Sequence, residues 1–149
     1  MSVLSRPRPA ETIHPLENGD RLTRAEFERR YHAMPHVKKA ELIKGVVYMP
    51  SPVNQRMHGE PHFIVNAWAG LYAVSTPGIE GGDNPSLRFD DDNEPQPDVC
   101  LFVKPEFGGD VQIDAKEYLT SAPEWVGEVA ASSASMICTT SSTFIAIMG

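Results

Sequence analysis

Apolar side chains first recur at helical spacing in a short segment near the N-terminus. Thr23 is a residue type that caps helices, and Glu26 stands three positions later, as in a capping box. Leu22 and Phe27 flank this pair at the positions of a hydrophobic staple. The pattern predicts a helix that begins after Thr23 and ends before Pro35.

A second helical pattern lies between residues 57 and 75. Pro61 suits a first helical turn, and Thr76-Pro77-Gly78 ends the pattern. The large apolar residues recur at intervals of three and four, so we expect them to form the buried face of the main packing helix: Ile64, Trp68 and Leu71, with Val65 and Tyr72 beside them.

The remaining apolar runs are short, rich in β-formers and bounded by turn residues. Residues 37–50 predict a hairpin whose turn lies at Lys44-Gly45, and residues 104–123 predict an irregular loop. This order of elements predicts an α/β (α+β) fold with one central mixed sheet flanked by helices. The later strands are expected at residues 78–82, 86–89, 99–103 and 124–130.

The chain divides into three parts by composition. Residues 1–20 carry three prolines without periodicity, which predicts a flexible arm, and residues 21–135 form one domain. Residues 136–149 differ from the rest, because the chain has no charged residue after Glu128 and no lysine or arginine after Lys116. This tail therefore needs a separate explanation.

Composition excludes several classes of protein. The 41% hydrophobic fraction over 149 residues argues against a disordered chain, and two cysteines are too few for a disulfide framework or a four-cysteine zinc site. No signal-peptide core or apolar run of about 18 residues is present, so we expect a cytoplasmic protein without a membrane partner. The net charge of −7 argues mildly against non-specific DNA binding, although an acidic metal site contributes to it.

Carboxylates stand at two predicted strand ends. Asp98 follows Pro97 where one strand opens, and Glu128 lies late in the apolar strand that follows. Their carboxylates can converge at neighbouring strand ends, with Glu41 of the hairpin as a third, which would make an oxygen-rich site for Mg²⁺ or Mn²⁺. The alternative is that Asp98 merely opens a strand and that Glu128 faces water. Burial of Glu128 without a partner would be costly, which favours the metal site.

Histidines offer a weaker candidate site. His58 and His62 stand four apart at the start of the second helix and could bind a metal. They fit neither the His-Glu-x-x-His motif nor the deaminase motif, which needs a Pro-Cys-x-x-Cys partner. Ordinary polar helix positions are the better interpretation of this pair, so the sequence does not predict a zinc site.

Four motifs together resemble the Uma-type restriction endonuclease family of the PD-(D/E)xK nuclease superfamily. They are Leu22-Thr-Arg-Ala-Glu-Phe27, residues 40–52, Gln96-Pro-Asp98 and Glu128-Val-Ala-Ala-Ser-Ser133. The resemblance implies a restriction-endonuclease-like core, Mg²⁺ or Mn²⁺ as cofactor, DNA as substrate and a possible homodimer. By position it implies catalytic roles for Asp98, Glu128 and Glu41, metal binding by Asp98 and Glu128, and a supporting role for His58.

The family's catalytic lysine lies on a helix after the serine-rich turn, and this chain has no counterpart there. A one-base shift would turn Met136-Ile137 into Asp and Met148-Gly149 into Gly, and it allows a family-like helix with a lysine at position 141. We therefore expect that the tail is a frameshift product, that the C-terminal helix and strand are missing, and that an apolar strand edge is left open at residues 124–130. The chain is then an impaired endonuclease, or alternatively a non-catalytic module that binds a protein or nucleic acid.

Overall fold

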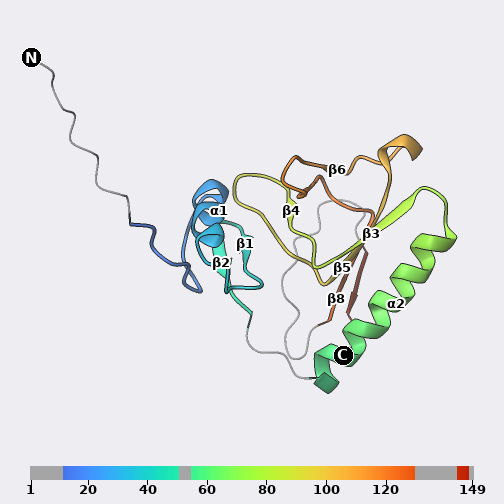
Figure 1. The fold of residues 1–149 in the computed structure, drawn as a ribbon, viewed down its shortest axis with the longest axis horizontal. Coiled ribbons are helices and arrows are strands. Elements are labelled where there is room, and N and C mark those ends of the chain that lie inside the picture. The colour runs from blue at the N-terminus through green and yellow to red at the C-terminus, as the bar shows by residue number, and fades with distance from the viewer. Residues whose placement is uncertain (1–11, 51–54, 130–143, 148–149) are drawn as a thin grey trace, which may run out of the picture.

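The computed structural model describes residues 12–50, 55–129 and 144–147 (Figure 1). It shows a mixed α+β arrangement, which confirms the predicted fold class. The largest sheet of the described strands is a mixed four-stranded sheet, as predicted, and separate sheets of two and three strands accompany it. Strands of two or three residues are too short to extend a single sheet across the molecule.

The N-terminal unit consists of one helix and one hairpin. Helix α1 (Arg24–His32) packs on strands β1 (Glu41–Ile43) and β2 (Val46–Tyr48), which pair antiparallel. Both turn residues, Lys44 and Gly45, have positive φ angles of 52° and 72°, as a type I′ turn requires, so the predicted hairpin is confirmed. The buried residues of this unit are Leu16, Phe27, Ala40, Leu42 and Val47.

The start of α1 differs from the predicted capping box. Thr23 has the extended backbone of an N-cap residue, but its side chain makes no capping hydrogen bond. The Glu26 carboxylate instead forms ion pairs with Arg29 and Arg30, at 2.7 and 2.6 Å. Two guanidinium groups on the same helix face attract this carboxylate more strongly than one backbone N–H does.

Part of the predicted flexible arm is ordered against the hairpin. Leu16 is buried, and the Gly19 N–H donates to the Val47 carbonyl at 2.8 Å. Residues 1–11 and 130–135 lie outside the described residues, as do positions 136–143 and 148–149 of the predicted aberrant tail.

The main sheet has the order β3-β5-β8-β9 and consists of β3 (Ile79–Asp83), β5 (Val99–Val103), β8 (Trp125–Glu128) and β9 (Phe144–Ile147). Strand β5 pairs antiparallel with both β3 and β8, and β9 runs parallel to β8. The expectation of an open edge at residues 124–130 was therefore wrong. Residues 144–147 were not expected to form a strand, yet an uncharged run can pair with an apolar neighbour.

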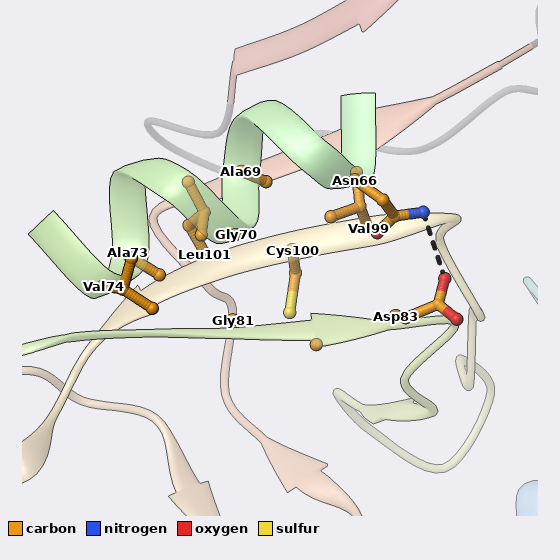
Figure 2. Close-up of a pocket in the computed structure, with 11 residues that line it drawn as sticks. Asn66, Ala69, Gly70, Ala73, Val74, Gly81, Asp83, Val99, Cys100 and Leu101 are labelled. Atoms are coloured by element: carbon orange, nitrogen blue, oxygen red, sulfur yellow. Dashed lines mark hydrogen bonds between the residues drawn. The ribbon is translucent and has the colours of Figure 1, made fainter. Parts of the chain in front are cut away.

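Helix α2 (Glu60–Ser75) covers one face of this sheet and follows a π-helical turn, η1 (Gln55–Gly59). The helix is confirmed, but its predicted buried face was wrong. Val65 and Ala69 are buried, and Ala73 packs beside them (Figure 2), whereas four large residues of the predicted face are exposed: Ile64, Trp68, Leu71 and Tyr72. Small side chains on this face allow the helix to approach β5 closely.

A third sheet lies on the other side of β5. It has the order β4-β7-β6, from β4 (Leu87–Arg88), β6 (Gln112–Ile113) and β7 (Leu119–Thr120). The region predicted as an irregular loop thus contains two short strands and a 3-10 turn, η2 (Pro105–Phe107). Leu87 and Leu119 anchor these elements in a core shared with Cys100, Phe102 and Val126. No helix in the part of the chain that the structure describes is long and apolar enough to span a membrane.

Candidate active site

The register between β5 and β8 brings two predicted site residues together. Val99 pairs with Gly127 in this antiparallel ladder, so Asp98, one residue before, lies opposite Glu128, one residue after. The Asp98 charge is close enough to raise the pKa of Glu128. The main sheet thus places Asp98 and Glu128 side by side at the strand ends, where the sequence led us to expect them.

Strand β1 delivers the third predicted carboxylate to the same place. Leu42 forms an antiparallel bridge with Glu94, which aligns β1 with the segment that leads into β5. As a result, the backbone N–H of Gln96 donates to Glu41 Oε1 at 2.7 Å. This hydrogen bond holds the Glu41 carboxylate close enough to Asp98 for the Asp98 charge to raise the pKa of Glu41.

Asp98 is the centre of the cluster, and its side chain is only 3% exposed. Asp98 Oδ2 accepts a hydrogen bond from the Val129 N–H at 2.9 Å and lies 3.3 Å from His58 Nε2. Asp98 Oδ1 accepts a hydrogen bond from Lys39 Nζ at 3.0 Å. Both oxygens are therefore held in place by donors from separate segments of the chain.

The acids of the cluster titrate differently because their partners differ. The pKa of Asp98 is held below its ordinary value, because the Val129 N–H and Lys39 outweigh the effect of burial. Burial and the neighbouring Asp98 charge raise the pKa of Glu128 to about 8. Asp98 is therefore ionised at neutral pH while Glu128 keeps a proton, as expected for two carboxyls that share a site.

Glu41 and Lys39 complete the electrostatics. Burial raises the pKa of Glu41, although the Gln96 N–H and Lys39 oppose the shift. Burial lowers the pKa of Lys39, but the carboxyls of Asp98, Glu128 and Glu41 together raise it above its ordinary value. Lys39 is thus an ammonium surrounded by three acids.

His58 and His62 contact different carboxylates, although His62 Nε2 also lies 3.4 Å from the Asp98 carbonyl oxygen. His58 in η1 reaches Asp98, in agreement with a supporting place in the site, and π-helical turns of this kind are frequent at functional sites. His62 Nε2 lies 3.3 Å from Asp83 Oδ1 and 2.9 Å from the Asn66 amide, whose nitrogen also donates to Asp83 (Figure 2). The two rings are 5.4 Å apart, and they face different carboxylates.

The types of ligand atom in the cluster fit a hard divalent cation. Carboxylate oxygens from Asp98, Glu128 and Glu41 are the ligand type that Mg²⁺ and Mn²⁺ prefer. Among the described residues, however, no group of three or more His, Cys, Asp or Glu side chains is already arranged around one metal position. A cation between Asp98 and Glu128 would replace the proton on Glu128 and displace Lys39 Nζ from Asp98 Oδ1.

Lys39 is the site residue that sequence reasoning missed. The family resemblance implied a lysine after Glu128, whereas Lys39 precedes all three acids of the cluster in the sequence. The available signal was the spacing Lys39-Ala40-Glu41. Alternate residues of an extended segment point to the same side, so Lys39 and Glu41 share one side while buried Ala40 takes the other.

Comparison with known proteins agrees with this arrangement. The sequence profile of the Uma2 family, described as "Putative restriction endonuclease", matches residues 24–137. This chain belongs to the Uma2 family. The match covers three of the four motifs in full and the first from Arg24 onward, and it includes every acid of the cluster.

One solved structure is also similar to this Uma2 chain. It is described as "a putative nuclease belonging to DUF820" from Anabaena variabilis ATCC 29413 and is 16% identical, with a TM-score of 0.40. The similarity covers 67% of this chain and 55% of that chain, so the Uma2 chain spans about half the length of this relative. No curated protein sequence matches the chain.

Proposed function

We propose that this Uma2 chain is a metal-dependent endonuclease that hydrolyses DNA phosphodiester bonds. The observation that carries the proposal is the pairing of buried Asp98 with half-buried Glu128 at the ends of adjacent strands. The Asp98 charge raises the pKa of Glu128, so a bound divalent cation would stabilise the form in which both carboxyls are ionised. Mg²⁺ or Mn²⁺ is the cation that the oxygen donors of the site fit.

The residues of the cluster would have different roles around that cation. Asp98 and Glu128 would hold it, and Glu41 would lie beside it as a further carboxylate. When bound, the cation lowers the pKa of the attacking water and neutralises charge on the phosphate. The Val129 N–H, His58 and the Gln96 N–H orient the acids, which preserves their geometry when the substrate enters.

A second candidate function is a non-catalytic module that binds a protein or nucleic-acid partner. One contact favours it, because Lys39 already neutralises Asp98 without any metal ion. The net charge of −7 also opposes tight DNA binding, so an active enzyme would be most effective at low ionic strength.

The expected impairment of the chain rested on the lack of a lysine after Lys116. Lys39 reaches the acids from the opposite direction along the chain, so a lysine is present in the site after all. An assay of Mg²⁺-dependent DNA cleavage therefore tests whether the chain is impaired. It also distinguishes the endonuclease from the non-catalytic module.

Titration of Mn²⁺ into the wild-type protein and into Asp98→Asn tests the site. We expect wild type to bind one Mn²⁺, and Asp98→Asn to lose at least tenfold in affinity because a ligand charge is gone. Glu128→Gln should weaken binding similarly, while Asp110→Asn, a change at an exposed acid, should bind as wild type does. Equal Mn²⁺ binding by wild type and Asp98→Asn would remove the basis of the proposal.

We also propose a homodimer, as the family resemblance implies, in which α2 packs against α2 of a second copy. Phe63, Leu71 and Val74 on its outer face are 74%, 67% and 84% exposed. Apolar residues gathered on one helix face often mark an interface. Leu71→Lys should then convert a dimer to a monomer in sedimentation experiments, and a wild-type monomer would contradict this proposal.

A further inference from the structure

Lys39 differs from the neighbouring Lys38 in its exposure and in its contact with Asp98. Its side chain is 21% exposed and Nζ lies 3.0 Å from Asp98 Oδ1, whereas Lys38 is exposed. The contact joins residues 59 positions apart in the sequence, so it exists only because β1 lies along the segment that leads into β5. The fold thus delivers one of two adjacent lysines to the acids.

The local geometry keeps Lys39 and Glu41 directed toward the same cluster. Ala40, between them, is 2% exposed and packs in the core of the N-terminal unit, which fixes the rotation of this extended segment. A side chain that leaves the backbone on the Glu41 side therefore reaches Asp98 without strain. The order Lys-x-Glu places an acid and an ammonium on one side of a strand, as (Asp/Glu)-x-Lys does in the reverse direction.

We propose that Lys39 is a catalytic residue of this site and supplies the positive charge that the chain lacks after Glu128. This inference rests on the proposed nuclease function. In the free protein Lys39 Nζ donates to Asp98, and in the complex with DNA it donates to a non-bridging oxygen of the scissile phosphate. It thereby stabilises the negative charge that develops on that oxygen.

The reaction balances without a further reactant. The oxygen of a water molecule forms a bond to phosphorus while the bond from phosphorus to the leaving sugar oxygen breaks. The water loses one proton to solvent, and the sugar oxygen gains one. Lys39 remains an ammonium throughout, so it contributes charge and hydrogen bonds but does not act as the base.

A purely structural Lys39 would behave differently toward a metal ion. If Lys39 only held Asp98 in position, its removal would disorder that ligand and weaken Mn²⁺ binding. If Lys39 instead shares the site with the cation, its charge opposes that of the metal, and removal strengthens Mn²⁺ binding. Metal affinity therefore separates the two roles independently of catalysis.

The test compares Lys39→Met, Lys39→Arg and the control Lys38→Met, with Lys39→Gln as a replacement should the Met variant not fold. We expect Lys39→Met to lower kcat about 100-fold or more while KM for DNA changes less than about threefold. Lys39→Arg should recover at least about a tenth of the wild-type kcat, and Lys38→Met should stay within about threefold of it. Mn²⁺ should bind Lys39→Met at least about threefold more tightly than it binds wild type.

Three results would overturn the proposal. The first is a Lys39→Met variant that cleaves nearly as fast as wild type, and the second is one that binds Mn²⁺ more weakly. The third is a wild-type protein that binds Mn²⁺ through Asp98 but cleaves no DNA, because the positive charge of Lys39 would then not support catalysis. Equal Mn²⁺ binding by wild type and Asp98→Asn would instead contradict the proposed metal site, so the two failures are distinguishable.

Discussion

Glu94 is a buried acid without a complete set of partners. It is 2% exposed, and its Oε2 lies 4.0 Å from Arg88 Nε, too far for a hydrogen bond. Burial, together with the charge and hydrogen bond of Glu28, raises the pKa of Glu94 to about 8. The folded protein therefore keeps a proton on Glu94 at neutral pH, whereas the unfolded chain releases it near pH 4.5.

This difference predicts that Glu94 opposes folding at high pH. Between about pH 4.5 and 8 the folded state binds more protons than the unfolded state, so stability from this group is present below pH 4.5 and is lost as pH rises through 8. Glu94→Gln should raise the free energy of unfolding at pH 8.5 by about 2 kcal/mol and change it little at pH 4.

Urea denaturation at both pH values measures the effect, with the exposed Glu106→Gln as the matched control. The control variant should follow the wild-type pH profile. A Glu94→Gln variant less stable than wild type at pH 8.5 would show that Glu94 is ionised and paired with Arg88 in the folded protein.

At the residue scale, the acids of the candidate site could be predicted from the sequence, but the lysine that contacts them could not. Asp98 and Glu128 stand where strand ends are readable from apolar runs, and an acid within such a run is conspicuous. Lys39 lies in the segment predicted as a hairpin, and no sequence pattern places that hairpin beside Asp98. Its neighbour Lys38 carries the same charge, so charge alone does not distinguish the two lysines. The role of Lys39 depends on the pairing of Leu42 with Glu94, a tertiary contact that no local pattern encodes.

At the scale of the elements, the packing of α2 on the main sheet leads to a testable prediction. Ala69 is 2% exposed against the main sheet, while Ala67 on the same helix is exposed. Ala69→Leu should destabilise the protein by about 1–3 kcal/mol, because three added carbons must enter the close contact between α2 and β5. Denaturation in urea measures the change.

Ala67→Leu is the matched control, because it makes the same change of volume on the opposite face. It should alter stability by less than about 0.5 kcal/mol. A larger loss of stability from Ala67→Leu than from Ala69→Leu would mean that the face with Ile64 and Trp68 is the buried one, as hydrophobic periodicity alone predicts.

The wrong prediction for this helix has a physical explanation. Periodicity identifies an apolar stripe by the size and hydrophobicity of its members, so Trp68 and Leu71 dominated the pattern. The structure buries the stripe that allows the closest approach to the sheet, which alanines provide. The hairpin was predictable because its turn needs two residues with positive φ, whereas β4, β6 and β7 have two residues each and carry no periodic signal.

At the scale of the whole molecule, Arg88 connects the N-terminal unit to the third sheet. Its guanidinium lies on β4, forms an ion pair with Glu28 of α1 at 2.6 Å, and forms another with Asp114 before β7. It also stacks 3.9 Å from the centre of the Tyr118 ring. Because the N-terminal unit carries Glu41 at the start of β1 and Lys39 just before it, this connection helps to position both residues in the candidate site.

Arg88→Met should therefore affect stability and metal binding together. Loss of the guanidinium leaves Glu28 and Asp114 without their common partner, and the side chain of Arg88 is only 12% exposed, so we expect a loss of about 3 kcal/mol in urea denaturation. Mn²⁺ affinity should fall as well, because Glu41 is no longer held against the segment before β5. The exposed Arg21→Met is the control and should change neither quantity. A stable Arg88→Met protein with wild-type Mn²⁺ binding would show instead that the bridge from Leu42 to Glu94 holds the N-terminal unit in place without this cluster.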